Sequence, residues 1–163
     1  MIKAVYQFLV VFFQIIFPAK RAVRVGGIMP DFFVPIDTTQ YTDYHRNIVA
    51  KGVVIKTTMK FIESHRKELQ SKYKKFETFN DKFEISDEIL ANMQTLAEQE
   101  KIKFDEKQYR KSLPLIKTQL KALIARDLWD MNEYFQIMNT TDSSVLQALK
   151  VLNEGAYEKV VRL

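Results

Sequence analysis

Hydrophobic residues recur at three- and four-residue steps along most of this chain, which is the spacing of one face of an α-helix. The clearest example lies between residues 105 and 138, where one side stays apolar for about seven helical turns. Asp105 stands at its start and predicts an N-terminal cap. The apolar positions of this predicted helix are Leu113, Ile116, Leu120, Leu123, Ile124, Leu128, Met131, Phe135 and Met138.

Pro114 interrupts this long helical pattern. A proline inside a helix removes a backbone donor and crowds the preceding turn. We therefore expect the helix to kink at this point, or to restart with Ser112 as a new cap.

The same spacing predicts two helices nearer the N-terminus. Thr38 or Thr39 is expected to cap the first, which ends near Gly52, a residue type that commonly terminates helices. The second helix is expected from residue 53 to 73. Its apolar positions, which should face the core, are Ile55, Met59, Ile62 and Leu69.

Residues 75–86 break the helical period and predict a connector with three phenylalanines that dock on the core: Phe76, Phe79 and Phe83. Ser86 then caps a helix with two acidic residues in its first turn, where negative charge is favourable. The apolar face of that helix is Ile89, Leu90, Met93, Leu96 and Ala97. A last helix is expected over residues 143–153.

These patterns predict a mainly α fold, a helical bundle of roughly four to six helices. The chain divides into three parts: an apolar and basic N-terminal segment (residues 1–25), an extended segment rich in glycine and proline (26–37) and a helical C-terminal domain (38–163).

The N-terminal segment has one early lysine, Lys3, and then runs apolar from Ala4 to Phe17, broken by two glutamines. This run is shorter than the roughly 20 residues that a helix needs to span a bilayer. Three interpretations stay open: a signal peptide or membrane anchor, a buried helix or strand, and an N-terminus replaced through loss or frame shift of upstream coding sequence. Membrane contact through residues 4–17 belongs to the first of these.

The net charge of +5 is unevenly distributed. The first 30 residues hold four bases and no acid, which leaves 21 bases and 20 acids for the rest of the chain. The helical domain is therefore close to neutral, and no basic face for nucleic acid is predicted. Cysteine is absent, which excludes disulfides and thiolate metal sites.

The two histidines, His45 and His65, lie on predicted helices among charged neighbours. Neither has a second histidine or a carboxylate at the spacing of a metal-ligand motif. We therefore interpret both as solvated or capping residues and predict no metal site.

Two short stretches, "SHRK" from Ser64 and "SKYK" from Ser71, match the S-x-x-K pattern of serine acylases. Both lie on a polar, charge-dense helix without the companion motifs, so we interpret them as coincidences. No phosphate-binding loop follows Gly26 and Gly27. The sequence predicts no catalytic residue and no cofactor-binding residue.

The segment "GGIMPDFFVPID" resembles the G-G-I-x-P-D-x-x-V-P stretch that closes the protease domain of the carboxyl-terminal processing (tail-specific) serine proteases. Seven positions match it, and the resemblance implies a structural role for them: Gly26, Gly27, Ile28, Pro30, Asp31, Val34 and Pro35. The helical remainder is similar to the C-terminal extension of the Bacteroidetes-type members. The resemblance thus covers about residues 26–153.

In that family the PDZ domain and the catalytic Ser/Lys pair lie upstream of the glycine segment, and they match no residue of this chain. The resemblance implies that this chain is a C-terminal domain or remnant of a periplasmic protease that processes the C-termini of proteins. It would itself be non-catalytic, with a scaffold or docking role toward the protease domain or an envelope protein or peptide. The alternative is an autonomous, membrane-tethered helical module of the cell envelope that binds a protein partner.

Overall fold

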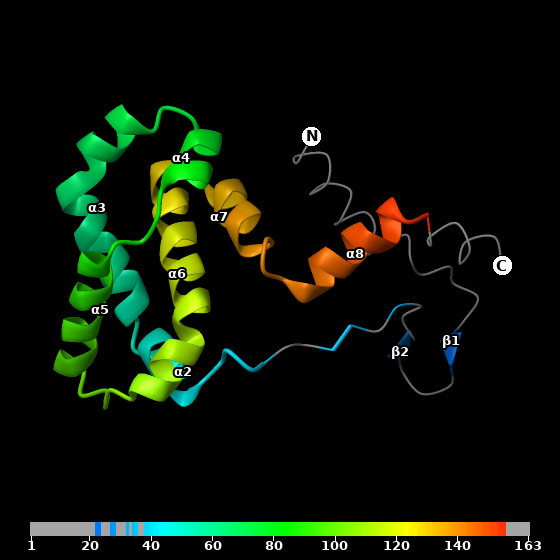
Figure 1. Cartoon of the computed structure of the whole chain (residues 1–163), viewed down its shortest axis with the longest axis horizontal. Coiled ribbons are helices and arrows are strands. Elements are labelled where there is room, and N and C mark those ends of the chain that lie inside the picture. Colours follow the sequence, from blue (N-terminus) through cyan, green and yellow to red (C-terminus); the bar gives the residue numbers. More distant parts are fainter. Residues whose placement is uncertain (1–21, 24–26, 29–31, 33, 36–37, 156–163) are drawn as a thin grey trace. The chain divides into compact units, whose positions relative to one another are not determined.

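The computed structural model describes residues 22–23, 27–28, 32, 34–35 and 38–155 (Figure 1). The described part is mainly helical, as the sequence predicts, and contains seven helices, α2 to α8. The chain separates into two compact units. One is formed by residues 37–142 and holds α2 to α7, and the other combines residues 1–36 with 143–163.

The first helix of the larger unit, α2 (Asp43–Ala50), is capped by Thr42. The Thr42 hydroxyl accepts a hydrogen bond from the main-chain N–H of His45 at 3.3 Å. The predicted cap at Thr38 or Thr39 is therefore wrong. The Thr38 carbonyl instead accepts from the Tyr41 N–H, which closes a turn before the helix. Beyond α2, Gly52 adopts a left-handed conformation (φ +68°), which glycine tolerates without steric cost.

Helix α3 (Val53–Lys72) buries only two of its four predicted core positions, Ile62 and Leu69. Ile55 and Met59 are 47% and 54% exposed, whereas Thr57 and Thr58 are buried. The two threonine hydroxyls donate to main-chain carbonyls one turn earlier, at 2.8 and 3.0 Å, which makes their burial tolerable. Because α3 packs against both α5 and α6, its buried arc is wider than one apolar stripe.

Residues 75–86 are not merely a connector, because Phe76–Lys82 forms the short helix α4. The docking of its phenylalanines is confirmed, since Phe76, Phe79 and Phe83 are all buried. Phe79 stacks on Phe83 with ring centroids 4.6 Å apart and contacts Trp129 at 5.3 Å. Helix α5 (Asp87–Gln99) follows as predicted, and the Ser86 hydroxyl accepts from the Ile89 N–H.

Helix α6 (Glu106–Leu128) begins at the predicted cap, where Asp105 Oδ1 accepts from the Gln108 N–H at 2.9 Å. The helix runs through Pro114 without restarting. Ser112 is consequently not a cap but a fully buried residue inside the helix. Its hydroxyl donates to the Gln40 carbonyl at 2.7 Å and so joins α6 to the segment before α2.

The long helix predicted over residues 105–138 is in fact two helices. Trp129 leaves helical geometry (φ −127°, ψ −101°), and Asp130 caps α7 (Met131–Met138) by accepting from the Asn132 N–H at 2.6 Å. Helix α7 then packs back against α6. Apolar periodicity continues across the break, so the periodicity could not reveal it.

The core of this unit lies between α2, α3, α5 and α6, and α4 and α7 add Phe79 and Ile137 to it (Figure 1). Helix α3 contacts both α5 and α6, and α2 contacts α3 and α6. The largest completely buried apolar side chains are Phe79, Ile48, Ile62, Met93, Ile116, Leu120, Ile124 and Val53.

In the smaller unit, strands β1 (Ala22–Val23) and β2 (Gly27–Ile28) pair antiparallel, with Val23 opposite Gly27. Helix α8 spans Ser143–Asn153, as the sequence predicts, and Gly155 follows it with φ +64°. None of the described helices combines the length and the apolar character that crossing a membrane requires.

Several predictions fall outside the described residues. Three residues of the family motif, Gly26, Pro30 and Asp31, are outside the described part. So are residues 1–21, which make up the greater part of the N-terminal segment. The three interpretations of that segment, including membrane contact through residues 4–17, therefore stay predictions.

Candidate functional site

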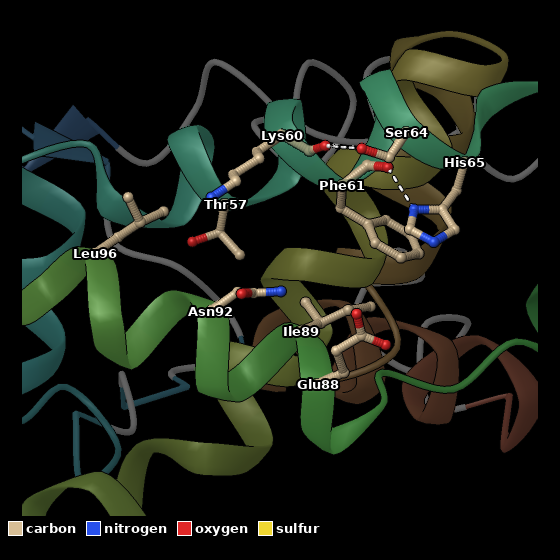
Figure 2. Close-up of a pocket in the computed structure, with 9 residues that line it drawn as sticks. All are labelled: Thr57, Lys60, Phe61, Ser64, His65, Glu88, Ile89, Asn92 and Leu96. Carbon is tan, nitrogen blue, oxygen red and sulfur yellow. Dashed lines mark hydrogen bonds between the residues drawn. The ribbon is translucent and has the colours of Figure 1, made fainter.

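A hollow of about 110 Å³ lies between α3 and α5 (Figure 2). We call it the α3–α5 groove. All of it belongs to the larger unit, so its geometry is set by the packing of these two helices. Its lining residues are Thr57, Lys60, Phe61, Ser64 and His65 from α3, and Glu88, Ile89, Asn92 and Leu96 from α5.

Apolar side chains form the floor of the groove. Ile89 is buried, and Phe61 and Leu96 are half-buried and pack against the core. The Thr57 hydroxyl is occupied by its bond to the Val53 carbonyl, so this residue presents its methyl group. The floor therefore offers apolar surface to an entering group.

His65 forms part of the wall in a fixed orientation. Its ring Nδ1 lies 3.0 Å from the main-chain carbonyl oxygen of Phe61, and its ring stacks on that of Phe61 with centroids 4.5 Å apart. A carbonyl oxygen only accepts, so in the neutral ring the proton lies on Nδ1. Nε2 is then an acceptor. His65 is half-buried and its Nδ1 bonds inside its own helix, so it does not cap a helix end, but it stays partly solvated as predicted.

Two opposite charges stand on the rim, Lys60 on α3 and Glu88 on α5. Both side chains are exposed, and neither makes a hydrogen bond or ion pair with another described residue. The side-chain amide of Asn92 is likewise without a hydrogen-bond partner in the described part of the chain. The rim thus has donors and acceptors that internal contacts leave available to a partner.

The serines of the two S-x-x-K stretches do not meet a lysine. Ser64 is exposed and its hydroxyl donates to the Lys60 main-chain carbonyl at 3.3 Å. Ser71 is exposed near the end of α3, while Lys74 lines a second hollow of about 210 Å³ beside Trp129. Among the described residues, no three His, Cys, Asp or Glu side chains gather as a metal site would require.

A buried polar contact between α2 and α6 was not expected from the sequence. His45 is only 3% exposed, so its prediction as a solvated or capping histidine is wrong. Its Nε2 lies 3.0 Å from the Gln119 amide oxygen, to which it donates. The Thr42 and Ser112 hydroxyls meet 2.7 Å apart in the same interface. His45 and Gln119 are 74 residues apart, a distance at which no local signal connects them.

Next to His45, Tyr44 is buried with its hydroxyl unpartnered. Burial, with smaller contributions from Tyr109 and Glu98, raises the pKa of Tyr44 to about 12. Its ring packs edge-on against Phe104 and Tyr109, so Tyr44 is a packing residue and not part of the α3–α5 groove.

The family model described as a family of unknown function, DUF8443, matches residues 44–130. This is more than half of the chain, and the chain therefore belongs to that family. The matched region runs from α2 to the cap of α7 and includes every residue that lines the α3–α5 groove. No curated protein and no solved structure matches the chain.

Proposed function

We propose that the helical domain is a non-catalytic docking domain that binds a segment of a protein partner in the α3–α5 groove. One observation carries the proposal: an apolar floor of Phe61, Ile89 and Leu96 lies beneath a rim of unpaired polar groups. Polypeptide recognition needs this combination, since apolar side chains anchor the segment while polar groups fix its main chain.

The groove offers no nucleophile with a general base. The Ser64 hydroxyl bonds to a helix carbonyl, and the His65 Nδ1 bonds to another. Nucleophilic catalysis requires a base within hydrogen-bond reach of the nucleophile and a third group that orients the base. The groove therefore supports binding better than turnover.

The docking proposal is tested by selecting peptides from a random display library on the full chain and measuring their affinity for two variants. Asn92→Trp places a large ring in the groove from an exposed position, whereas Ala91→Trp adds the same ring at the neighbouring exposed position outside it. We expect Asn92→Trp to weaken binding at least about tenfold and Ala91→Trp to leave it unchanged. Equal affinity for both variants would place binding elsewhere.

We further propose that the partner is the protease domain of a carboxyl-terminal processing protease, or another envelope protein or peptide. The seven matched positions of the glycine and proline segment, from Gly26 to Pro35, support the protease relationship. Gel filtration tests it by mixing the full chain with such a protease that lacks its own C-terminal extension. Co-elution supports the relationship, and separate elution at micromolar concentrations opposes it.

The apolar run of residues 4–17 supports a second proposal, an envelope module held at a membrane surface. Sedimentation with lipid vesicles tests it by comparing the full chain with a chain that lacks residues 1–20. Sedimentation that depends on residues 1–20 supports the tether, and equal behaviour of the two chains opposes it.

A further inference from the structure

We propose that the end of the α3–α5 groove formed by His65 and Glu88 binds a basic side chain, arginine above all, of the docked segment. This inference rests on the proposed docking function and adds the chemistry of the anchor residue.

His65 presents an acceptor to the groove. The Phe61 carbonyl oxygen holds the ring proton on Nδ1, at 3.0 Å, and so leaves the lone pair of Nε2 unused in the described part of the chain. A ligand group that bonds to this nitrogen must therefore donate.

Glu88 adds a second acceptor from the opposite wall. Its carboxylate has no partner among the described residues and belongs to α5, whereas His65 belongs to α3. Figure 2 shows both side chains at the same end of the groove. A guanidinium group carries several donors in one plane and can serve two acceptors at once.

The aromatic pair supplies the surface for the rest of the anchor. The Phe61 and His65 rings are nearly parallel, with 22° between their planes, and Ile89 continues the apolar floor. The aliphatic stem of an arginine packs on such a floor, and its guanidinium plane stacks on aromatic rings.

Lys60 does not oppose a basic anchor at this end. Figure 2 shows its ammonium group directed toward Thr57, away from His65 and Glu88. Lys60 and His65 are also separated by five residues of α3, which is a rise of about 7.5 Å along the helix. The groove therefore has an anionic end and a cationic end, and its anionic end selects the basic side chain.

The test uses the peptides selected on the full chain and two charge-matched variants. Glu88→Gln removes the proposed acceptor charge, and Glu63→Gln removes an equal charge from an exposed position of α3 outside the groove. The peptides are compared with copies in which arginine is replaced by citrulline, its neutral isostere. Affinities are measured by fluorescence anisotropy.

We expect the selected peptides to share an arginine or lysine, and their affinity to fall about tenfold or more with Glu88→Gln or with citrulline. Glu63→Gln should leave the affinity unchanged. Peptides that are blocked by Asn92→Trp but lack a shared basic residue, or that tolerate Glu88→Gln, would overturn this inference and leave the docking function standing. If no selected peptide is blocked by Asn92→Trp, both proposals fail.

Discussion

The imidazole of His45 on α2 donates a hydrogen bond to the side-chain amide of Gln119 on α6, with Nε2 and Oε1 3.0 Å apart. His45 is 3% exposed, and its other ring nitrogen, Nδ1, has no partner in the described part of the chain. This bond therefore gives a partner to one of the two ring nitrogens of His45, Nε2. It links the first helix of the larger unit to the longest.

Breaking this bond from either side should destabilise the unit. We expect His45→Leu and Gln119→Leu each to lower the free energy of unfolding by about 1–3 kcal/mol, because each leaves the other group, buried His45 or half-buried Gln119, without its partner. The double variant should lose clearly less than the sum of the two. Urea denaturation of all four chains measures the coupling, and strictly additive losses would contradict it.

Replacing Tyr44 should affect the free energy of unfolding in the opposite way to replacing its neighbour His45. Its buried hydroxyl has no partner, so Tyr44→Phe removes an unsatisfied group while keeping the ring contacts with Phe104 and Tyr109. We expect the free energy of unfolding at neutral pH to stay the same or to rise. A loss of 1 kcal/mol or more, about what an ordinary hydrogen bond contributes, would show that the hydroxyl has a partner.

Tyr44 also predicts a dependence of stability on alkaline pH. Its pKa rises from 10.0 to about 12 in the folded state, because burial disfavours the phenolate. When folding raises the pKa of a group, the group contributes its full stabilisation at pH values below its unfolded pKa. This stabilisation is lost as the pH rises from the unfolded pKa through the folded pKa. The loss should therefore fall between about pH 10 and 12. Urea denaturation across this range should show a shallower decline for Tyr44→Phe than for the unchanged chain.

Glu133 and Asp130 predict a second pH dependence, at the start of α7. Burial, followed by the hydrogen bond with Asp130, raises the pKa of Glu133 above its ordinary value. Protonated Glu133 therefore stabilises the fold at low pH, and this contribution is lost as pH rises through the raised pKa. We expect Glu133→Gln to remove that part of the pH dependence in thermal unfolding. An unchanged pH profile would contradict the role of this pair.

The observed face of α3 can be tested with two residues one turn apart. Ile62 is 2% exposed and Met59 is 54% exposed, although apolar spacing predicts both in the core. We expect Ile62→Ala to cost about 2–5 kcal/mol in unfolding free energy and Met59→Ala to change it by less than about 0.5 kcal/mol. Similar losses of unfolding free energy at the two positions in urea denaturation would contradict the observed exposure of Met59 and support its predicted place in the core.

Local signals in the sequence predict the helix starts that depend on a single side chain. Ser86 and Asp105 are predicted as caps because each precedes an apolar period, and their hydroxyl and carboxylate accept the expected N–H bonds. At the first helix three threonines compete within five residues, and spacing alone did not single out Thr42. The break at Trp129 was hidden because apolar periodicity continues across it.

The candidate site could be predicted less well, because it depends on packing between segments distant in the sequence. The α3–α5 groove joins His65 to Glu88, and the buried bond joins His45 to Gln119. Each histidine has unremarkable sequence neighbours, so its burial and orientation follow only from the helices packed against it. Residues 1–21, where the sequence offers three interpretations, lie outside the described part.

The most direct test of a docking role for the α3–α5 groove is a nuclear magnetic resonance titration of the isotope-labelled full chain with the tightest selected peptide. We expect saturable amide shifts concentrated in residues 57–65 of α3 and 88–96 of α5, with the largest near His65 and Glu88. Shifts that map to other helices, or a titration that never saturates, would contradict it.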